Sequence, residues 1–345
     1  MKFQDNFDLT QFLKSNFQLP TDLESLRGRE ARKVADSILR LSDFYIEDQK
    51  NTTPSTPWKE NWAIEAYSAY FLPLNLQRAR RVVEKGLEVG FFEGLEKFVD
   101  FGCGPATVSS VLKDLHAWKE FYLTDISAAP VEKLAPKFLP NFSTTWKPAL
   151  IKGSTSLAVF SYVINELGTI PSWALECEAI MIIEPSTSVQ ARRLMEMRKL
   201  LLANGFHLWA PCTHHQECPL LKNSKTDWCH DAVMTERPQW FLEIENYLPM
   251  KNERITFSYL LARKTPPKTR ARGRIVGDLL KEKGKRRQMY CESEDRIFLS
   301  WLDRHYSPKA PVGYERGDLI AELPPHEKVS NEYRILEPVN KLSDS

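Results

Sequence analysis

Several features are scarce or missing from this sequence, and each absence narrows the class of protein. No apolar run approaches the roughly 20 residues of a membrane-spanning helix, so no membrane partner is expected. The first residues show neither the apolar core of a signal peptide nor the composition of a transit peptide, which predicts a cytoplasmic protein. Six cysteines in 345 residues do not make a disulfide framework. In a reducing compartment, clustered thiols are more often metal ligands.

What remains is the composition of a globular protein with two or three domains. Apolar residues at helical spacing predict an N-terminal helical region over residues 1–95. Short apolar runs alternate with helical segments over residues 96–264, which predicts an α/β fold with a parallel sheet between helices. A cysteine-rich insertion, residues 211–253, interrupts this core. Residues 265–345 contain two prolines near their start, Pro266 and Pro267, and are predicted to form a small basic C-terminal segment.

The predicted strands and helices of the core follow from these runs. The strands are expected at residues 98–101, 121–123, 157–163, 179–183, 206–210 and 254–262. The helices are expected at residues 105–115, 129–138 and 189–204.

A glycine turn follows the first predicted strand and has the character of a nucleotide-cofactor loop. Gly102 and Gly104 allow a tight turn and a close approach of the backbone to a ligand. Asp125 ends the second predicted strand about 20 residues later, where an acid accepts hydrogen bonds from ribose hydroxyls. Asp100 before the glycines, together with the missing third glycine, favours S-adenosylmethionine over a dinucleotide. The alternative is an α/β turn that binds nothing.

The sequence says less about the residues that would bind the methyl acceptor. The segment at residues 161–167 contains no N-P-P-Y box, which would hold a base amino group, and no cysteine nucleophile. Asn165 is a candidate cofactor-binding residue, but Asn165 and Glu166 could equally cap the following helix. The sequence therefore identifies neither a catalytic residue nor the methyl acceptor.

A second candidate site is a set of cysteines in the later part of the chain. The candidate metal ligands are Cys212, Cys218, Cys229 and Cys291. Their spacing is neither the paired pattern of a zinc ribbon nor a ferredoxin run, and it suits a cluster that bridges two segments. His214, His215 and His230 keep a Cys/His zinc site open, and a metal-free interpretation also remains. A metal shared with Cys291 would fix the C-terminal segment to the core.

Nine lysines and arginines between residues 268 and 287 form the most basic stretch of the chain. They could neutralise phosphates, while Tyr290, Trp301 and Tyr306 could stack on unpaired bases. This interpretation favours RNA over DNA. The alternative is a solvated loop with no partner.

Several short motifs together resemble one known family. They lie at residues 67–78, 100–106, 161–167, 184–185, 210–212, 218–220, 228–230, 291 and 317–318. The chain resembles the methyltransferase-like proteins of the small ribosomal subunit, found in mitochondria and bacteria. Three positions depart from the family pattern: Ala106 and Ser186 replace glycines, and Asp231 stands where an aromatic residue is usual.

The resemblance implies a class I S-adenosylmethionine-dependent methyltransferase fold with a [4Fe–4S] cluster on the four cysteines. It also implies association with small-subunit ribosomal RNA during ribosome assembly. The leading hypothesis is therefore a methyltransferase-like protein that binds S-adenosylmethionine and acts on or binds this RNA. The alternatives are a non-catalytic iron–sulfur assembly factor that binds RNA, and a zinc-stabilised methyltransferase of small molecules.

Overall fold

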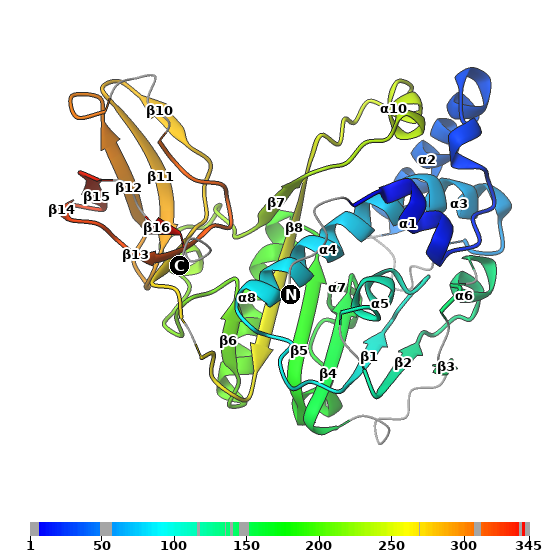
Figure 1. Cartoon of the computed structure of the whole chain (residues 1–345), viewed down its shortest axis with the longest axis horizontal. Coiled ribbons are helices and arrows are strands. Elements are labelled where there is room, and N and C mark those ends of the chain that lie inside the picture. The colour runs from blue at the N-terminus through cyan, green and yellow to red at the C-terminus, as the bar shows by residue number, and fades with distance from the viewer. Residues whose placement is uncertain are drawn as a thin grey trace. The chain divides into compact units, whose positions relative to one another are not determined.

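The computed structural model of the chain is shown in Figure 1. It describes residues 7–48, 57–115, 118–134, 136–138, 141–144, 152–268, 270–306, 312–337 and 340–341. The chain divides into two compact units. The first consists of Met1–Val83, Glu96–Leu150 and Val233–Ile255, and the second of Glu84–Leu95, Ile151–Ala232 and Thr256–Ser345. None of the helices in the described ranges is long and apolar enough to span a membrane.

The N-terminal part of the first unit is helical, as the apolar spacing predicts. Its elements are α1 (Leu9–Asn16), η1 (Leu23–Ser25), α2 (Gly28–Asp48), α3 (Asn61–Ala66), η2 (Tyr67–Phe71) and α4 (Leu72–Glu88). Helix α1 begins at a cap, because the Asp8 side chain accepts a hydrogen bond from the Gln11 N–H at 2.9 Å. Helix α2 buries one face, since Ala31, Val34 and Ile38 recur three and four residues apart.

Three parallel strands of the first unit follow these helices. They are β1 (Lys97–Phe101), β2 (Glu120–Thr124) and β3 (Asn141–Ser143), ordered β3-β2-β1. Helix α5 (Thr107–Leu112) connects β1 to β2, and α6 (Ala129–Leu134) follows β2. In β1, Phe98, Val99 and Asp100 are all buried, so the strand lies inside the fold. The expected β–α alternation is therefore present.

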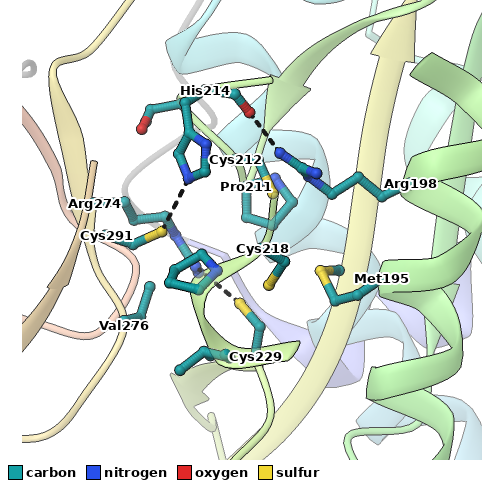
Figure 2. Close-up of a pocket in the computed structure, with 13 residues that line it drawn as sticks. Met195, Arg198, Pro211, Cys212, His214, Cys218, Cys229, Arg274, Val276 and Cys291 are labelled. Atoms are coloured by element: carbon teal, nitrogen blue, oxygen red, sulfur yellow. Dashed lines mark hydrogen bonds between the residues drawn. The ribbon is translucent and has the colours of Figure 1, made fainter. Parts of the chain in front are cut away.

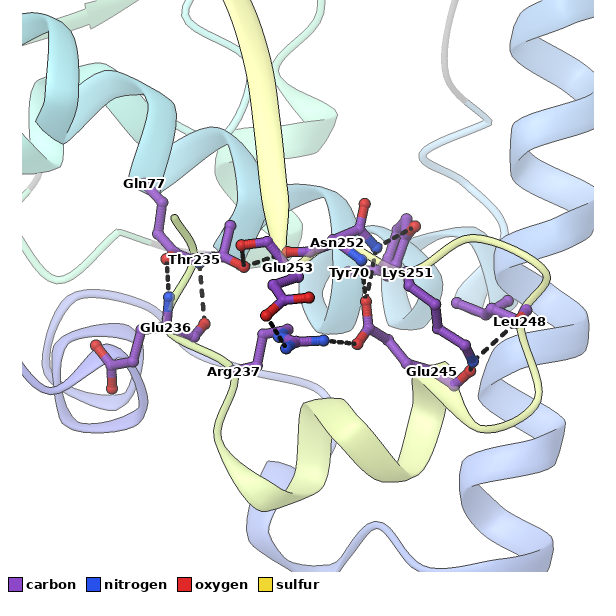
Figure 3. Close-up of polar contacts among 10 residues, drawn as sticks. All are labelled: Tyr70, Gln77, Thr235, Glu236, Arg237, Glu245, Leu248, Lys251, Asn252 and Glu253. Carbon is purple, nitrogen blue, oxygen red and sulfur yellow. Dashed lines mark hydrogen bonds and ion pairs between the residues drawn. The ribbon is translucent and has the colours of Figure 1, made fainter. Parts of the chain in front are cut away.

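A polar network within the first unit attaches α10 (Gln239–Glu245) and the loop after it to the N-terminal helices (Figure 3). Gln77 and Glu236 exchange two hydrogen bonds through the Gln77 amide, at 2.6 and 3.3 Å. The Asn252 amide donates to Tyr70 Oη at 2.8 Å and to Glu245 Oε1 at 2.9 Å. The later half of the predicted insertion thus belongs to the first unit and its earlier half to the second.

The second unit contains the other strands of the first sheet. They are β4 (Gly153–Ser161), β5 (Cys177–Glu184), β6 (His207–Ala210), β7 (Asp231–Met234) and β8 (Arg254–Arg263). The order is β4-β5-β8-β6, and β7 pairs with β8. Its helices are α7 (Ile164–Leu167), η4 (Ser172–Glu176), α8 (Ser188–Ala203) and α9 (Pro219–Asn223).

The direction of one strand corrects the expectation of a fully parallel sheet. Strands β4 and β5 are parallel, but β8 is antiparallel to both β5 and β6. An apolar run predicts a buried strand without giving its direction, because burial does not depend on direction. The α/β class is confirmed, with a mixed sheet.

Residues 273–341 form a second sheet, named here the C-terminal sheet, where the sequence predicts only a small basic segment. Its strands are β9 (Gly273–Ile275), β10 (Leu280–Glu282), β11 (Lys285–Cys291), β12 (Ile297–Leu302), β13 (Leu319–Glu322), β14 (His326–Val329), β15 (Glu332–Ile335) and β16 (Asn340–Lys341). Tyr290, Trp301 and Tyr333 belong to its apolar core. Gly273 is required beside this core, because a Cβ there would lie 2.2 Å from the Tyr290 ring.

Candidate functional site

The predicted cofactor loop folds back onto the end of β2. Gly102 and Gly104 have φ values of 67° and 51°, which favour glycine. The Gly102 N–H donates to the Thr124 carbonyl at 2.8 Å, and the Gly104 N–H donates to Asp125 Oδ2 at 2.9 Å. A Cβ built on Gly104 meets no atom within 4 Å, so the space above this residue is open.

Asp125 closes this loop and keeps acceptor capacity for a ligand. Its second oxygen accepts a hydrogen bond from the Ser127 N–H at 2.9 Å. A carboxylate offers about four lone-pair sites, so about two remain for the two hydroxyls of a ribose. The side chain of the next residue, Ile126, is 88% exposed and presents an apolar surface beside the carboxylate. This arrangement suits a nucleoside.

Asp100 lies behind the glycines and is buried. Ser109 Oγ donates to its Oδ2 at 2.7 Å, whereas its Oδ1 has no hydrogen-bond partner among the residues that the structure describes. Burial is the main reason that the pKa of Asp100 is raised to about 6; hydrogen bonds from Ser109 act to lower it, and the nearby Asp125 charge acts to raise it. A buried acceptor without a partner is costly, so a donor group from a ligand would stabilise it. The ammonium group of S-adenosylmethionine has the required chemistry.

Ala106 shows why a glycine is usual at its position. Its φ is 62°, in the left-handed region, and its side chain is completely buried just before α5 begins. An L-residue pays about 1–2 kcal/mol for this conformation. We therefore expect Ala106→Gly to raise the free energy of unfolding by about 1 kcal/mol, measured by urea denaturation. Ala63→Gly, inside helix α3, is the matched control and should lower it. A lower free energy of unfolding in Ala106→Gly than in the wild type would contradict the inferred strain at this position.

Asn165 belongs to the second unit, whereas the other four predicted cofactor residues belong to the first. It lies in α7, and no side chain caps that helix at its N-cap residue, Val163. Instead, the Ile164 N–H donates to Glu184 Oε1 at 2.9 Å. The Asn165 carbonyl accepts a hydrogen bond from Arg193 at 3.1 Å, and its side-chain oxygen is buried without a partner among the described residues. A cofactor role for Asn165 stays a prediction.

Glu184 makes the second unit sensitive to pH. Burial raises its pKa from 4.5 to about 8, although hydrogen bonds from backbone N–H groups lower it. The folded state therefore keeps a proton that the unfolded state releases, and stability should fall as pH rises from about 4.5 to about 8. Glu184→Gln should flatten this dependence, which is on the order of a few kcal/mol. Urea denaturation between pH 5 and 8 measures it, with the exposed Glu176→Gln as control. An unchanged slope in Glu184→Gln would contradict the assignment.

The four predicted cysteine ligands line one pocket within the second unit (Figure 2). Cys212 follows β6, Cys218 precedes α9, Cys229 precedes β7, and Cys291 ends β11. The cavity has a volume of about 20 Å³, and apolar side chains, including Val276 from the C-terminal sheet, complete its lining. The structure thus brings together thiols that are up to 79 residues apart in the sequence (291 − 212).

Two basic side chains contact the thiols (Figure 2). His214 Nε2 lies 3.4 Å from Cys291 Sγ, and Arg274 Nη1 donates to Cys229 Sγ at 3.6 Å. His214 is held in place through its backbone carbonyl, which accepts a hydrogen bond from Arg198 at 2.8 Å. The N–H···S hydrogen bond from the Arg274 guanidinium favours the anionic form of Cys229.

The thiols influence one another electrostatically. Burial is the main reason that the pKa of Cys218 is raised to about 11, and the neighbouring Cys212 and Cys229 contribute to the increase. Burial also raises the pKa of Cys229 and of Cys291, although Arg274 acts in the opposite direction on both. Several anions in one buried pocket require a compensating cation, and metal binding to such thiols releases their protons.

The donor set of the pocket can be compared with those of two metal centres. In the described part of the chain, no three His, Cys, Asp or Glu side chains are arranged to hold one metal ion. A zinc site needs four donors about 2.3 Å from a single point. A [4Fe–4S] cluster is likewise held by four cysteine thiolates. Four thiols in one pocket match the ligand set of either centre, and the metal itself stays a prediction.

The positions of the histidines give little support to a Cys/His zinc site. Only His214 lines the pocket with the cysteines. His215 Nε2 instead lies 3.2 Å from the Leu208 N–H and 3.1 Å from Arg270 Nη2. Burial lowers the pKa of His230 to about 4, so this side chain is neutral at physiological pH.

The structure corrects the interpretation of the basic stretch. Tyr290 and Trp301 are 1% and 2% exposed, so the prediction that they stack on bases is wrong. Most of the basic side chains form ion pairs within the protein: Lys268–Glu93, Arg272–Glu292, Arg274–Asp231, Lys285–Glu332, Arg286–Asp303 and Arg287–Glu282. Lys281 and Lys283, at the β10 end of the hairpin, are exposed. The stretch is thus mainly a charge-paired strand hairpin.

Two buried charged residues beside Cys229 were not predicted to belong to this site. Arg274 was counted among the phosphate-binding residues, and Asp231 was noted only as a departure from a family pattern. Both are buried beside Cys229, where they form an ion pair at 2.9 Å. Charge patterns in the sequence contain no signal for this pair, because its partners lie 43 residues apart.

Several of the solved structures that this chain resembles are methyltransferases. A putative RNA methyltransferase from Pyrococcus horikoshii has 16% identity and a TM-score of 0.32, covering 66% of this chain and 99% of that one. The magnesium protoporphyrin IX methyltransferase from Synechocystis has 15% identity and a TM-score of 0.33, covering 68% and 100%. A methyltransferase from Archaeoglobus fulgidus has 15% identity and a TM-score of 0.32, covering 64% and 99%. At these values the similarity does not extend to substrate or mechanism.

No curated protein matches the sequence. The comparison with protein families does give a match, over residues 66–300, to the family described as mitochondrial small ribosomal subunit Rsm22. This range includes the cofactor loop and all four cysteines of the pocket. The match spans more than half of the chain, and the predicted resemblance to small-subunit methyltransferase-like proteins is confirmed: the chain belongs to the Rsm22 family.

Proposed function

We propose that the protein binds S-adenosylmethionine and acts on, or binds, small-subunit ribosomal RNA during ribosome assembly. The observation that carries the cofactor assignment is the hydrogen bond from the Gly104 N–H to Asp125 Oδ2. It holds an open glycine turn against an acid that keeps free acceptor sites. The partner is inferred from the family, whose description names the mitochondrial small ribosomal subunit.

The chemistry expected of this site depends mainly on orientation. A bound S-adenosylmethionine supplies an activated methyl group on a sulfonium. Methyl transfer then requires little covalent help, since holding donor and acceptor in line contributes most of the rate increase. Asp125 would orient the ribose, and Asp100 would pair with the ammonium group. Neither of these contacts requires a catalytic nucleophile.

We propose further that the cysteine pocket holds a [4Fe–4S] cluster with a structural role. Three ligands, Cys212, Cys218 and Cys229, come from the segment between β6 and β7, and Cys291 comes from the C-terminal sheet. When bound, the cluster supplies metal–thiolate bonds that cross-link these two segments. Metal binding of this kind contributes directly to folding free energy.

A non-catalytic assembly factor is the second candidate function. It is favoured by the segment at residues 161–167, which has no N-P-P-Y box for an acceptor base. In this case S-adenosylmethionine would stabilise the fold, and the RNA would be bound without modification.

One experiment separates the two candidates. Purified protein is titrated with S-adenosylmethionine by calorimetry, and the methyl-labelled cofactor is then incubated with protein and small ribosomal subunits. Binding followed by label in the RNA supports the methyltransferase. Binding of cofactor and subunits without label supports the assembly factor. No binding of either S-adenosylmethionine or subunits would contradict the proposal.

A further inference from the structure

Arg274 occupies an unusual position for an arginine. It lies on β9 directly opposite Cys291 on β11, so both side chains are on the same face of the C-terminal sheet. Its side chain is 3% exposed and lines the cysteine pocket. A buried guanidinium is costly unless it is paired, so the surrounding groups should explain why it is there.

Two acceptors hold the guanidinium. Its Nη2 donates to Asp231 Oδ2 at 2.9 Å, and its Nη1 donates to Cys229 Sγ at 3.6 Å. The Asp231 side chain is fully buried and fits against Gly317, where an added Cβ would lie 2.5 Å from the carboxylate oxygens. Asp231 thus fixes Arg274 through Nη2. Arg274 Nη1 is directed at the Cys229 sulfur (Figure 2).

We propose that the Asp231–Arg274 pair tunes the reduction potential of the metal centre, because it places one positive charge beside the Cys229 thiolate. The inference depends on the proposed [4Fe–4S] cluster. One-electron reduction adds one negative charge to such a centre, while no bond in the protein forms or breaks. Arg274 stabilises that extra charge through its charge and its N–H···S hydrogen bond. Hydrogen bonds to the sulfurs and buried charge are known determinants of cluster potentials.

The pair also explains the sequence departure at residue 231. An aromatic residue there would leave Arg274 without a counter-charge, whereas Asp231 balances it. Arg274 is therefore a positioning residue whose effect Asp231 moderates. Removal of Arg274 and removal of Asp231 should shift the reduction potential in opposite directions. A general loosening of the fold would not produce shifts of opposite sign.

The test is a dithionite titration of anaerobically purified protein, with the reduced centre followed by electron paramagnetic resonance. Arg274→Gln should make reduction harder, and Asp231→Asn should make it easier, because it leaves the arginine charge uncompensated. The double variant should lie between the two. Each single variant should change the ratio of oxidised to reduced centre at least tenfold, which is about 59 mV for a one-electron couple.

Arg272→Gln is the matched control. Arg272 lies on the same segment, but its side chain is partly exposed and pairs with Glu292 at 2.9 Å. It should leave the potential unchanged. Arg274→Lys keeps the charge and should stay closer to wild type than Arg274→Gln does.

Iron and acid-labile sulfide are measured on every variant first, so that two kinds of failure are distinguished. Wild-type protein without a cluster would overturn the proposed cluster and this inference with it. Intact clusters with equal potentials in all variants would overturn the inference alone. So would shifts of the same sign in both single variants, or folded variants of Arg274 and Asp231 that all lose the cluster.

Discussion

Cys291→Ser is expected to empty the cysteine pocket of metal and to destabilise the C-terminal sheet. Cys291 is the proposed ligand from this sheet, and the other three proposed ligands come from the segment between β6 and β7. Serine is a poor ligand for iron or zinc, so the cross-link between the two segments is lost. A structural metal contributes on the order of several kcal/mol, which predicts a melting temperature lower by roughly 10 °C.

The measurement combines metal analysis with differential scanning calorimetry and limited proteolysis. Cys177→Ala is the control, because Cys177 is buried in β5 and does not line the pocket. It should keep its iron and its protected C-terminal sheet, although it loses some packing. Full metal content in Cys291→Ser, with an unchanged melting temperature, would remove Cys291 from the ligand set.

Asp125→Ala is expected to weaken S-adenosylmethionine binding by about 100-fold or more. A hydrogen bond to a charged group contributes about 1.5–3 kcal/mol, and the carboxylate is expected to accept two from the ribose. The substitution also removes the acceptor for the Gly104 and Ser127 N–H groups, so the loop loses its closure. Titration calorimetry measures the affinity.

Two further variants sharpen this result. Asp125→Asn keeps a side-chain acceptor but removes the charge, so its affinity should lie between wild type and Asp125→Ala. Glu120→Ala alters an exposed acid at the other end of the same strand and should bind like wild type. Unchanged affinity in Asp125→Ala would remove the ribose assignment.

The parts of the fold that depend on local sequence patterns could be predicted from the sequence. Apolar periodicity and glycine turns gave the helices of the first unit and the alternation of strands and helices in the core. Asp100 and Asp125 could be placed at strand ends because the carboxyl ends of neighbouring parallel strands lie at one edge of a sheet. The grouping of four distant cysteines followed from their chemistry, since buried clustered thiols call for a common ligand.

The parts that were missed depend on contacts distant in sequence. The direction of β8 is set by its partners and not by its own apolar residues. The C-terminal sheet was not predicted because β11 begins with three basic residues, although every second residue of the strand, Arg286, Gln288 and Tyr290, is buried. When only the charges of its residues are considered, this segment resembles a phosphate-binding loop. As a strand, it buries one face and pairs the charges of the other with acids on neighbouring strands.

Arg274 shows the same limitation within the site. Four other arginines occur between residues 270 and 287, and only the register between β9 and β11 places this one beside Cys291. Its pairing with Asp231 gives a physical reason for an acid where the family pattern has an aromatic residue.

The most direct test of the account is the iron, acid-labile sulfide and zinc content of the wild-type protein, purified without oxygen. The account predicts iron and sulfide in equal amounts, little zinc, and loss of both in Cys229→Ser and Cys291→Ser. Stoichiometric zinc without sulfide, or no metal in protein whose C-terminal sheet is folded, would contradict it.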